Sequence, residues 1–150
     1  MLPIGWVKEI WRYPVKGMAG EMLATGSVDG LGIVGDRSWA VRETARREIQ
    51  SCKRHPNLLL CTASYLEGPT RGPAGQVKIR FPDGDEITSD HPDIDRRLTE
   101  LTGVDVTLEP FRPASDVDFY RRFNAGGDQW LKDLVATFAR EPGEPLPDFS

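Results

Sequence analysis

Two short segments of the sequence place a basic side chain among glycines, a combination that favours anion binding. The first is Tyr13-Pro14-Val15-Lys16-Gly17-Met18, and the second runs from Gly30 to Gly35-Asp36-Arg37. Glycine lets backbone N–H groups approach an oxyanion closely, and lysine and arginine add positive charge. Neither segment matches the phosphate-loop or dinucleotide-binding patterns. Composition alone favours the alternative, in which these glycines form turns between strands and Arg37 pairs with Asp36 or another carboxylate.

Charge is distributed unevenly along the chain. Six basic and two acidic residues lie between Arg37 and His55, whereas nine acidic residues and two arginines lie between Asp83 and Glu109. The molecule should therefore have a basic end that can hold a phosphate. Solvated strand faces and turns are the alternative explanation for this run of basic residues. The net charge of −4 leaves no global basic field for nucleic acid or anionic lipid, and we expect neither as a partner.

The cysteines and histidines do not form a metal-binding pattern. Cys52 and Cys61 are too few for a disulfide framework or a structural zinc site. His55 and His91 each precede a proline, which excludes a pair of histidines on one helical face. The basic neighbours of Cys52 favour a nucleophilic thiol, but no oriented base accompanies it, and we assign it no role.

The pattern of apolar residues and turn residues indicates many short strands and few helices. Strands are predicted over Ile4–Tyr13, Met22–Val28, Ser38–Arg42, Asn57–Tyr65 and Val104–Leu108, a hairpin over Val77–Phe81 and Glu86–Thr88, and helices over 92–102 and after Asp128. This order predicts an α+β, mainly β domain over residues 1–140, built as a small, partly closed β-barrel with one or two peripheral helices. Residues 141–150 are proline-rich and are predicted to be an extended, mobile tail or linker.

No segment has the features of a membrane span or an export signal. The longest run of strong hydrophobes is Leu58-Leu59-Leu60-Cys61, far short of the ~20 residues that cross a bilayer. The residues after Met1 include no basic flank followed by an apolar stretch, so we expect a cytoplasmic location and no membrane association.

The two glycine-containing segments also carry a family resemblance. Trp11-Arg12-Tyr13-Pro14-Val15-Lys16-Gly17, followed by Gly35-Asp36-Arg37-Ser38-Trp39-Ala40-Val41, resembles the opening of proteins with a MOSC (molybdenum cofactor sulfurase C-terminal) domain, and in particular their N-terminal β-barrel. Ser51-Cys52-Lys53-Arg54-His55-Pro56 and Phe81-Pro82-Asp83-Gly84 continue the resemblance, which covers nearly the whole chain.

The resemblance implies a cofactor and a partner. In that family the barrel packs beside the MOSC domain proper, and the two together hold a molybdenum cofactor (molybdopterin). By motif, Lys16 and Arg37 would contact the pterin phosphate, and Lys53 stands where family members often carry a basic residue. The cysteine that carries sulfur or ligates molybdenum belongs to the MOSC half, which this sequence does not contain.

We therefore expect the N-terminal module of a molybdenum-cofactor-dependent oxidoreductase or sulfur-transfer protein. It would supply basic contacts to the pterin phosphate and bind a MOSC domain in cis or in trans. It would not catalyse alone, and no catalytic or metal-ligating residue is assigned. The alternative is a stand-alone barrel that binds small anions or another protein.

Overall fold

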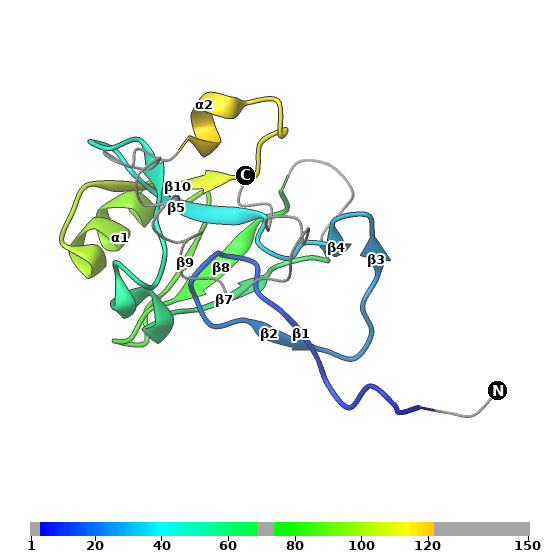
Figure 1. Ribbon diagram of the computed structural model, residues 1–150. Coiled ribbons are helices and arrows are strands. Elements are labelled where there is room, and N and C mark those ends of the chain that lie inside the picture. Colours follow the sequence, from blue (N-terminus) through cyan, green and yellow to red (C-terminus); the bar gives the residue numbers. More distant parts are fainter. Residues whose placement is uncertain (1–3, 69–73, 122–150) are drawn as a thin grey trace, which may run out of the picture.

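The computed structural model describes residues 4–68 and 74–121, and this part of the chain is mainly β with few helices (Figure 1). The strands are β1 (Ile10–Arg12), β2 (Glu21–Leu23), β3 (Val28–Asp29), β4 (Gly32–Ile33), β5 (Trp39–Glu43), β6 (Glu48–Ile49), β7 (Thr62–Tyr65), β8 (Val77–Arg80), β9 (Glu86–Thr88) and β10 (Val106–Pro110). The helices are η1 (Pro56–Leu60, 3-10), α1 (Ile94–Thr102) and α2 (Val117–Tyr120). The predicted small, mainly β fold is confirmed.

The strands form four small antiparallel sheets. Their orders are β1-β2, β3-β4, β10-β5-β6 and β7-β8-β9. Two isolated parallel bridges, Val15 with Trp39 and Ala19 with Thr62, connect the segment after β1 to the two three-stranded sheets. Within residues 4–68 and 74–121 the strand pairing does not close into a continuous barrel.

One hydrophobic core lies between the two three-stranded sheets and α1. In β8, Val77 and Ile79 are buried while Lys78 and Arg80 face outward, as the alternating sequence predicts. Helix α1 contributes Ile94 and Leu98 and ends at Gly103, whose φ of 75° is the left-handed conformation common after a helix. The largest fully buried side chains of the core are those of Leu58, Ile79, Leu98, Val15, Val41 and Val77.

Several predicted boundaries were wrong for local reasons. The strand predicted over Asn57–Tyr65 begins only at Thr62, because Pro56 starts a 3-10 turn that buries Leu58 and exposes Leu59 and Leu60. Residues 4–9 are exposed rather than paired, so the first strand is Ile10–Arg12.

The segment predicted as one strand over Met22–Val28 divides between β2 and β3. The strand predicted over Val104–Leu108 becomes β10, two residues later. The helix predicted after Asp128, the tail 141–150 and the domain boundary near residue 140 lie outside the described residues. Within the described part of the chain, no helix has both the length and the apolar character that crossing a bilayer requires.

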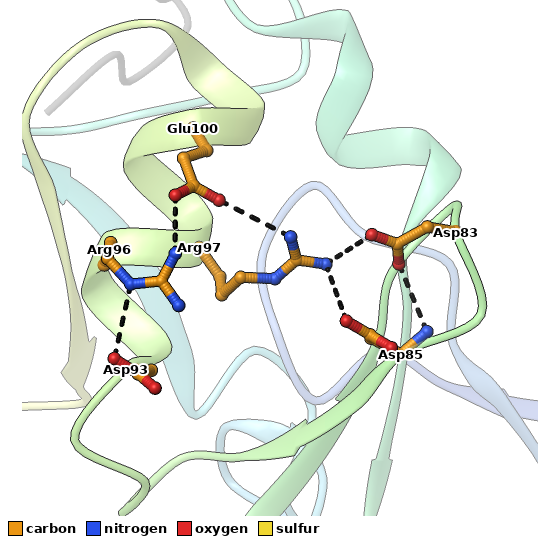
Figure 2. Close-up of polar contacts among 6 residues, drawn as sticks. All are labelled: Asp83, Asp85, Asp93, Arg96, Arg97 and Glu100. Carbon is orange, nitrogen blue, oxygen red and sulfur yellow. Dashed lines mark hydrogen bonds and ion pairs between the residues drawn. The ribbon is translucent and has the colours of Figure 1, made fainter.

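Arg97 of α1 fastens the β8–β9 turn to the helix (Figure 2). Its Nη2 is 2.5 Å from Asp83 Oδ2 and 3.3 Å from Asp85 Oδ2, and its Nη1 is 3.4 Å from Glu100 Oε2. The guanidinium carbon also lies 4.8 Å from the ring centroid of Phe81. Arg96, by contrast, pairs only with Asp93 and Glu100 at the exposed edge of the same helix.

We expect Arg97→Met to lower the melting temperature at pH 7 clearly more than the matched variant Arg96→Met. The hydrogen bond from Arg97 is the main cause that lowers the pKa of Asp83. A carboxylate with a lowered pKa stabilises the fold above its unfolded-state pKa, and this contribution is lost as the pH falls through the lower folded-state value. Thermal melts should therefore show the Arg97→Met deficit shrinking from pH 7 toward pH 2, and a deficit that stays constant would contradict this role.

Candidate functional site

Parallel backbone pairing brings the two glycine-containing segments side by side. The N–H of Arg37 donates to the Tyr13 carbonyl at 2.8 Å, and the N–H of Trp39 donates to the Pro14 carbonyl at 3.0 Å. The N–H of Lys16 then donates to the Trp39 carbonyl at 2.8 Å. Because each hydrogen bond fixes one segment against the other, Lys16 and Arg37 are brought to the same side of the molecule.

Asp36 and Arg37 form a tight turn at the end of this pairing. Asp36 Oδ1 accepts a hydrogen bond from the N–H of Tyr13 at 2.8 Å, so the carboxylate mainly anchors the backbone. Its Oδ2 lies 3.7 Å from Arg37 Nε, and the Arg37 side chain is 69% exposed. Such an exposed ion pair is worth only about 0–1 kcal/mol. The predicted pairing of Arg37 with Asp36 is present, and it leaves the guanidinium accessible to solvent.

Arg12, in the same motif as Lys16, has a different place. It is 7% exposed, and its Nη2 and Nε donate to Glu21 Oε1 at 2.7 and 3.0 Å. Its guanidinium carbon lies 4.6 Å from the centroid of the Tyr65 ring, and the Tyr65 hydroxyl donates to the Gly35 carbonyl. Arg12 thus joins β1, β2, β7 and the turn before Arg37.

Glycine is required at two points of the first motif. A Cβ on Gly20 would lie 2.1 Å from the Arg12 carbonyl oxygen, which no side chain can accommodate. Gly17 has a φ of 86°, and a Cβ there would lie 3.3 Å from the backbone nitrogen of Cys52. The close approach of the chain at Gly17 places the turn that carries Cys52 and Lys53 directly behind Lys16.

A cavity of about 150 Å³ joins Lys16 and Arg37 to the outer face of the sheet β10-β5-β6. Helix α2 lies beside β10 and β5 (Figure 1), and it contributes Phe119 and Tyr120 to the lining. The lining is mostly apolar and aromatic, with two cations and one carboxylate: Lys16, Arg37, Trp39, Ala40, Ile49, Glu109, Pro110, Phe111, Phe119 and Tyr120.

The carboxylate in this lining is held by an arginine outside it. Glu109 Oε2 accepts from Arg112 Nη2 at 3.1 Å, and Arg112 Nη1 lies 3.3 Å from Asp116 Oδ2. Arg112 therefore offsets part of the negative charge that Glu109 brings to the lining beside Lys16 and Arg37.

Lys53 does not line the cavity. It is exposed in the turn at residues 51–55, where the N–H groups of Arg54 and His55 donate to the Ser51 carbonyl. The structure thus brings together two of the three basic residues selected from the sequence. Neighbouring Arg54 contacts Glu48 at 3.6 Å, so acids of the β5–β6 hairpin offset part of the basic run.

The two cysteines differ in environment. Cys61 is buried, and burial, with a smaller contribution from Asp83, raises the pKa of its thiol to about 11. It is therefore a protonated thiol at neutral pH. Cys52 is half-buried beside Gly17. No group of His, Cys, Asp and Glu side chains within residues 4–68 and 74–121 is arranged to hold a metal ion.

Sequence reasoning missed the residues that α2 and β10 contribute to the cavity. The stretch around Asp116 and Tyr120 reads as a polar loop, and the ring of Phe119 gave no separate signal. The three aromatic residues Phe111, Phe119 and Tyr120 are the one sequence signal that could have indicated packing here, but only the fold shows what they pack against.

The comparison with known families agrees with this architecture. Residues 4–136 match the MOSC N-terminal beta barrel domain family, and the chain belongs to that family. No curated protein matches the sequence. Family membership relates the chain to molybdenum cofactor sulfurase-like proteins, a family generally associated with the molybdenum cofactor.

We expect Arg12→Met to destabilise the protein by about 3 kcal/mol, because it leaves the carboxylate of Glu21 without its buried partner. Chemical denaturation measures this loss. The double variant Arg12→Met, Glu21→Gln should recover part of the stability, since no unpaired charge remains. A stable Arg12→Met protein that has lost anion binding would instead make Arg12 a ligand-binding residue.

We expect Glu109→Gln to strengthen phosphate binding by roughly two- to tenfold, because it removes the negative charge from the cavity lining. Titration calorimetry with inorganic phosphate at low ionic strength measures the change. Glu67→Gln, at an exposed glutamate outside the cavity lining, is the matched control and should have no effect. Weaker binding in Glu109→Gln would place the anion elsewhere.

Proposed function

We propose that this domain is the N-terminal module of a molybdenum-cofactor-binding protein and that Lys16 and Arg37 bind the phosphate of the pterin. The observation that carries the proposal is the parallel pairing of Tyr13–Lys16 with Arg37–Trp39, which unites two cations from separate motifs at one cavity. A partly enclosed phosphate needs nearby positive charge to offset its desolvation, and lysine and arginine provide it.

The residues fit a phosphate better than they fit a whole cofactor. A cavity of about 150 Å³ holds one small group, whereas larger ligands occupy pockets of roughly 300–1,000 Å³. The remaining part of the cofactor would therefore lie against the MOSC domain. When bound, the molybdenum centre supplies redox or sulfur-transfer chemistry, and the residues described in this chain bind and orient the phosphate. Lys53 would act only at the periphery, since it is exposed beside the turn behind Lys16.

An exposed apolar surface supports a partner domain. The outer face of the β1-β2 sheet presents Trp11 opposite Met22, and the preceding arm exposes Ile4, Trp6 and Val7. Trp6 is 90% exposed and Met22 is 65% exposed. Large apolar side chains exposed on a sheet face and on the arm before it are typical of an interaction surface. In the proposed assembly a MOSC domain, in cis or in trans, covers this surface.

We expect Lys16→Ala and Arg37→Ala each to weaken phosphate or sulfate binding by about tenfold or more, corresponding to roughly 1.5–3 kcal/mol for a charge-assisted contact. The double variant should lose less than the sum, because both side chains hold one anion. Arg37→Lys should also lose much of the affinity, since the planar fork of the guanidinium is not replaced. Titration calorimetry on the whole chain measures these changes.

Two exposed cations distant from the cavity lining are matched controls. Lys8 and Arg80 lie before β1 and on β8, and their alanine variants should bind phosphate like the parent chain. Thermal melts of Lys16→Ala and Arg37→Ala should stay close to that of the parent. Unchanged binding in both alanine variants, or a loss of stability with no change in binding, would reject the phosphate site.

A further inference from the structure

We propose that the cavity beside Lys16 and Arg37 is a binding site for a small aromatic oxyanion, namely a single six-membered ring that carries a phosphate or carboxylate group. The inference rests on the proposed anion site and adds the ring to it. The charged group would lie between Lys16 and Arg37, and the ring would enter the space between β5 and α2.

The size of the cavity selects a single ring. An apolar cavity of about 150 Å³ in another protein binds benzene, and the cavity beside Lys16 has the same volume. A fused bicyclic or tricyclic ring system would exceed it. The ring of the proposed ligand is therefore smaller than a pterin, and such a ligand would compete with the cofactor phosphate for the two cations.

The aromatic walls are held in place before any ligand arrives. Trp39 Nε1 donates to the Gly75 carbonyl at 3.0 Å, which fixes the indole. The Phe119 ring lies between two guanidinium groups, 4.4 Å from that of Arg112 and 5.1 Å from that of Arg42. The Tyr120 hydroxyl donates to the Arg112 carbonyl at 2.6 Å and so ties α2 to the end of β10. Fixed walls reduce the entropy lost when a ring binds.

The charges of the lining favour an anion at one end of the ring. Among the lining residues that the structure describes, Lys16 and Arg37 are cationic, and the one carboxylate, Glu109, is paired with Arg112. The remaining side chains of the lining are apolar or aromatic and offer stacking and edge-to-face contacts. An aliphatic phosphate would use only the cations, whereas an aromatic phosphate would use the cations and the walls.

Titration calorimetry on the whole chain with methyl phosphate and phenyl phosphate tests the proposal. We expect phenyl phosphate to bind about tenfold or more tightly than methyl phosphate, because phenyl phosphate has a ring that can leave water and pack between the aromatic walls, and methyl phosphate has none. Inorganic phosphate should displace phenyl phosphate, since both need Lys16 and Arg37.

Two variants locate the ring. Ala40→Leu adds three carbons inside the cavity and should bring phenyl phosphate to the affinity of methyl phosphate, whereas Ala24→Leu, at an exposed alanine, should keep the preference. Phe111→Ala removes a wall at a position 54% exposed, so it tests the site without disturbing the core if Ala40→Leu does not fold.

The outcomes separate the two proposals. Equal affinities for phenyl and methyl phosphate, or a phenyl preference that survives both Ala40→Leu and Phe111→Ala, overturn the ring site and leave the proposed phosphate site standing. A phenyl preference that is lost in Ala40→Leu but does not depend on Lys16 or Arg37 supports the ring site and overturns the phosphate site. Absence of binding by every phosphate overturns both.

Discussion

The parallel hydrogen bonds between Tyr13–Lys16 and Arg37–Trp39 are the constraint on which the rest of the structure depends. They connect the β1-β2 sheet to the sheet β10-β5-β6, and the chain then continues to the bridge between Ala19 and Thr62. Parallel pairing needs a long connection between the two segments, and the β2–β4 region supplies it. The same few bonds therefore organise the core and set the positions of both cations.

Charge neutralisation decides which basic residues remain available to a ligand. Arg12 forms an ion pair with Glu21, Arg54 with Glu48 and Arg97 with Asp83. Each of these ion pairs joins separate elements of the fold. Arg37 contacts Asp36 at a distance of 3.7 Å and with a largely exposed side chain, so its charge still reaches solvent and the cavity. Several arginines of the sequence thus have structural partners, whereas Arg37 is exposed on a turn where its φ is positive.

Helix α2 and the segment after β10 pack on the outer face of β5 and form walls of the cavity. Phe119 stacks between Arg42 and Arg112, and Arg112 also pairs with Glu109. Helix α2 therefore supplies aromatic side chains to the cavity lining, while Arg112, which precedes it, pairs with Glu109. The exposed β1-β2 face lies on a different element, so the proposed anion site and the proposed partner surface are separate.

The sequence by itself determined the mainly β class, the Val77–Thr88 hairpin, α1 and the family, because these depend on local alternation, turn residues and spaced motifs. It also selected Lys16 and Arg37, whose glycine neighbours are a local signal. Only the tertiary structure decided that Lys53 lies outside the cavity lining and that Glu109 and Phe119 belong to it. These outcomes depend on contacts between residues far apart in the chain, which no local pattern encodes.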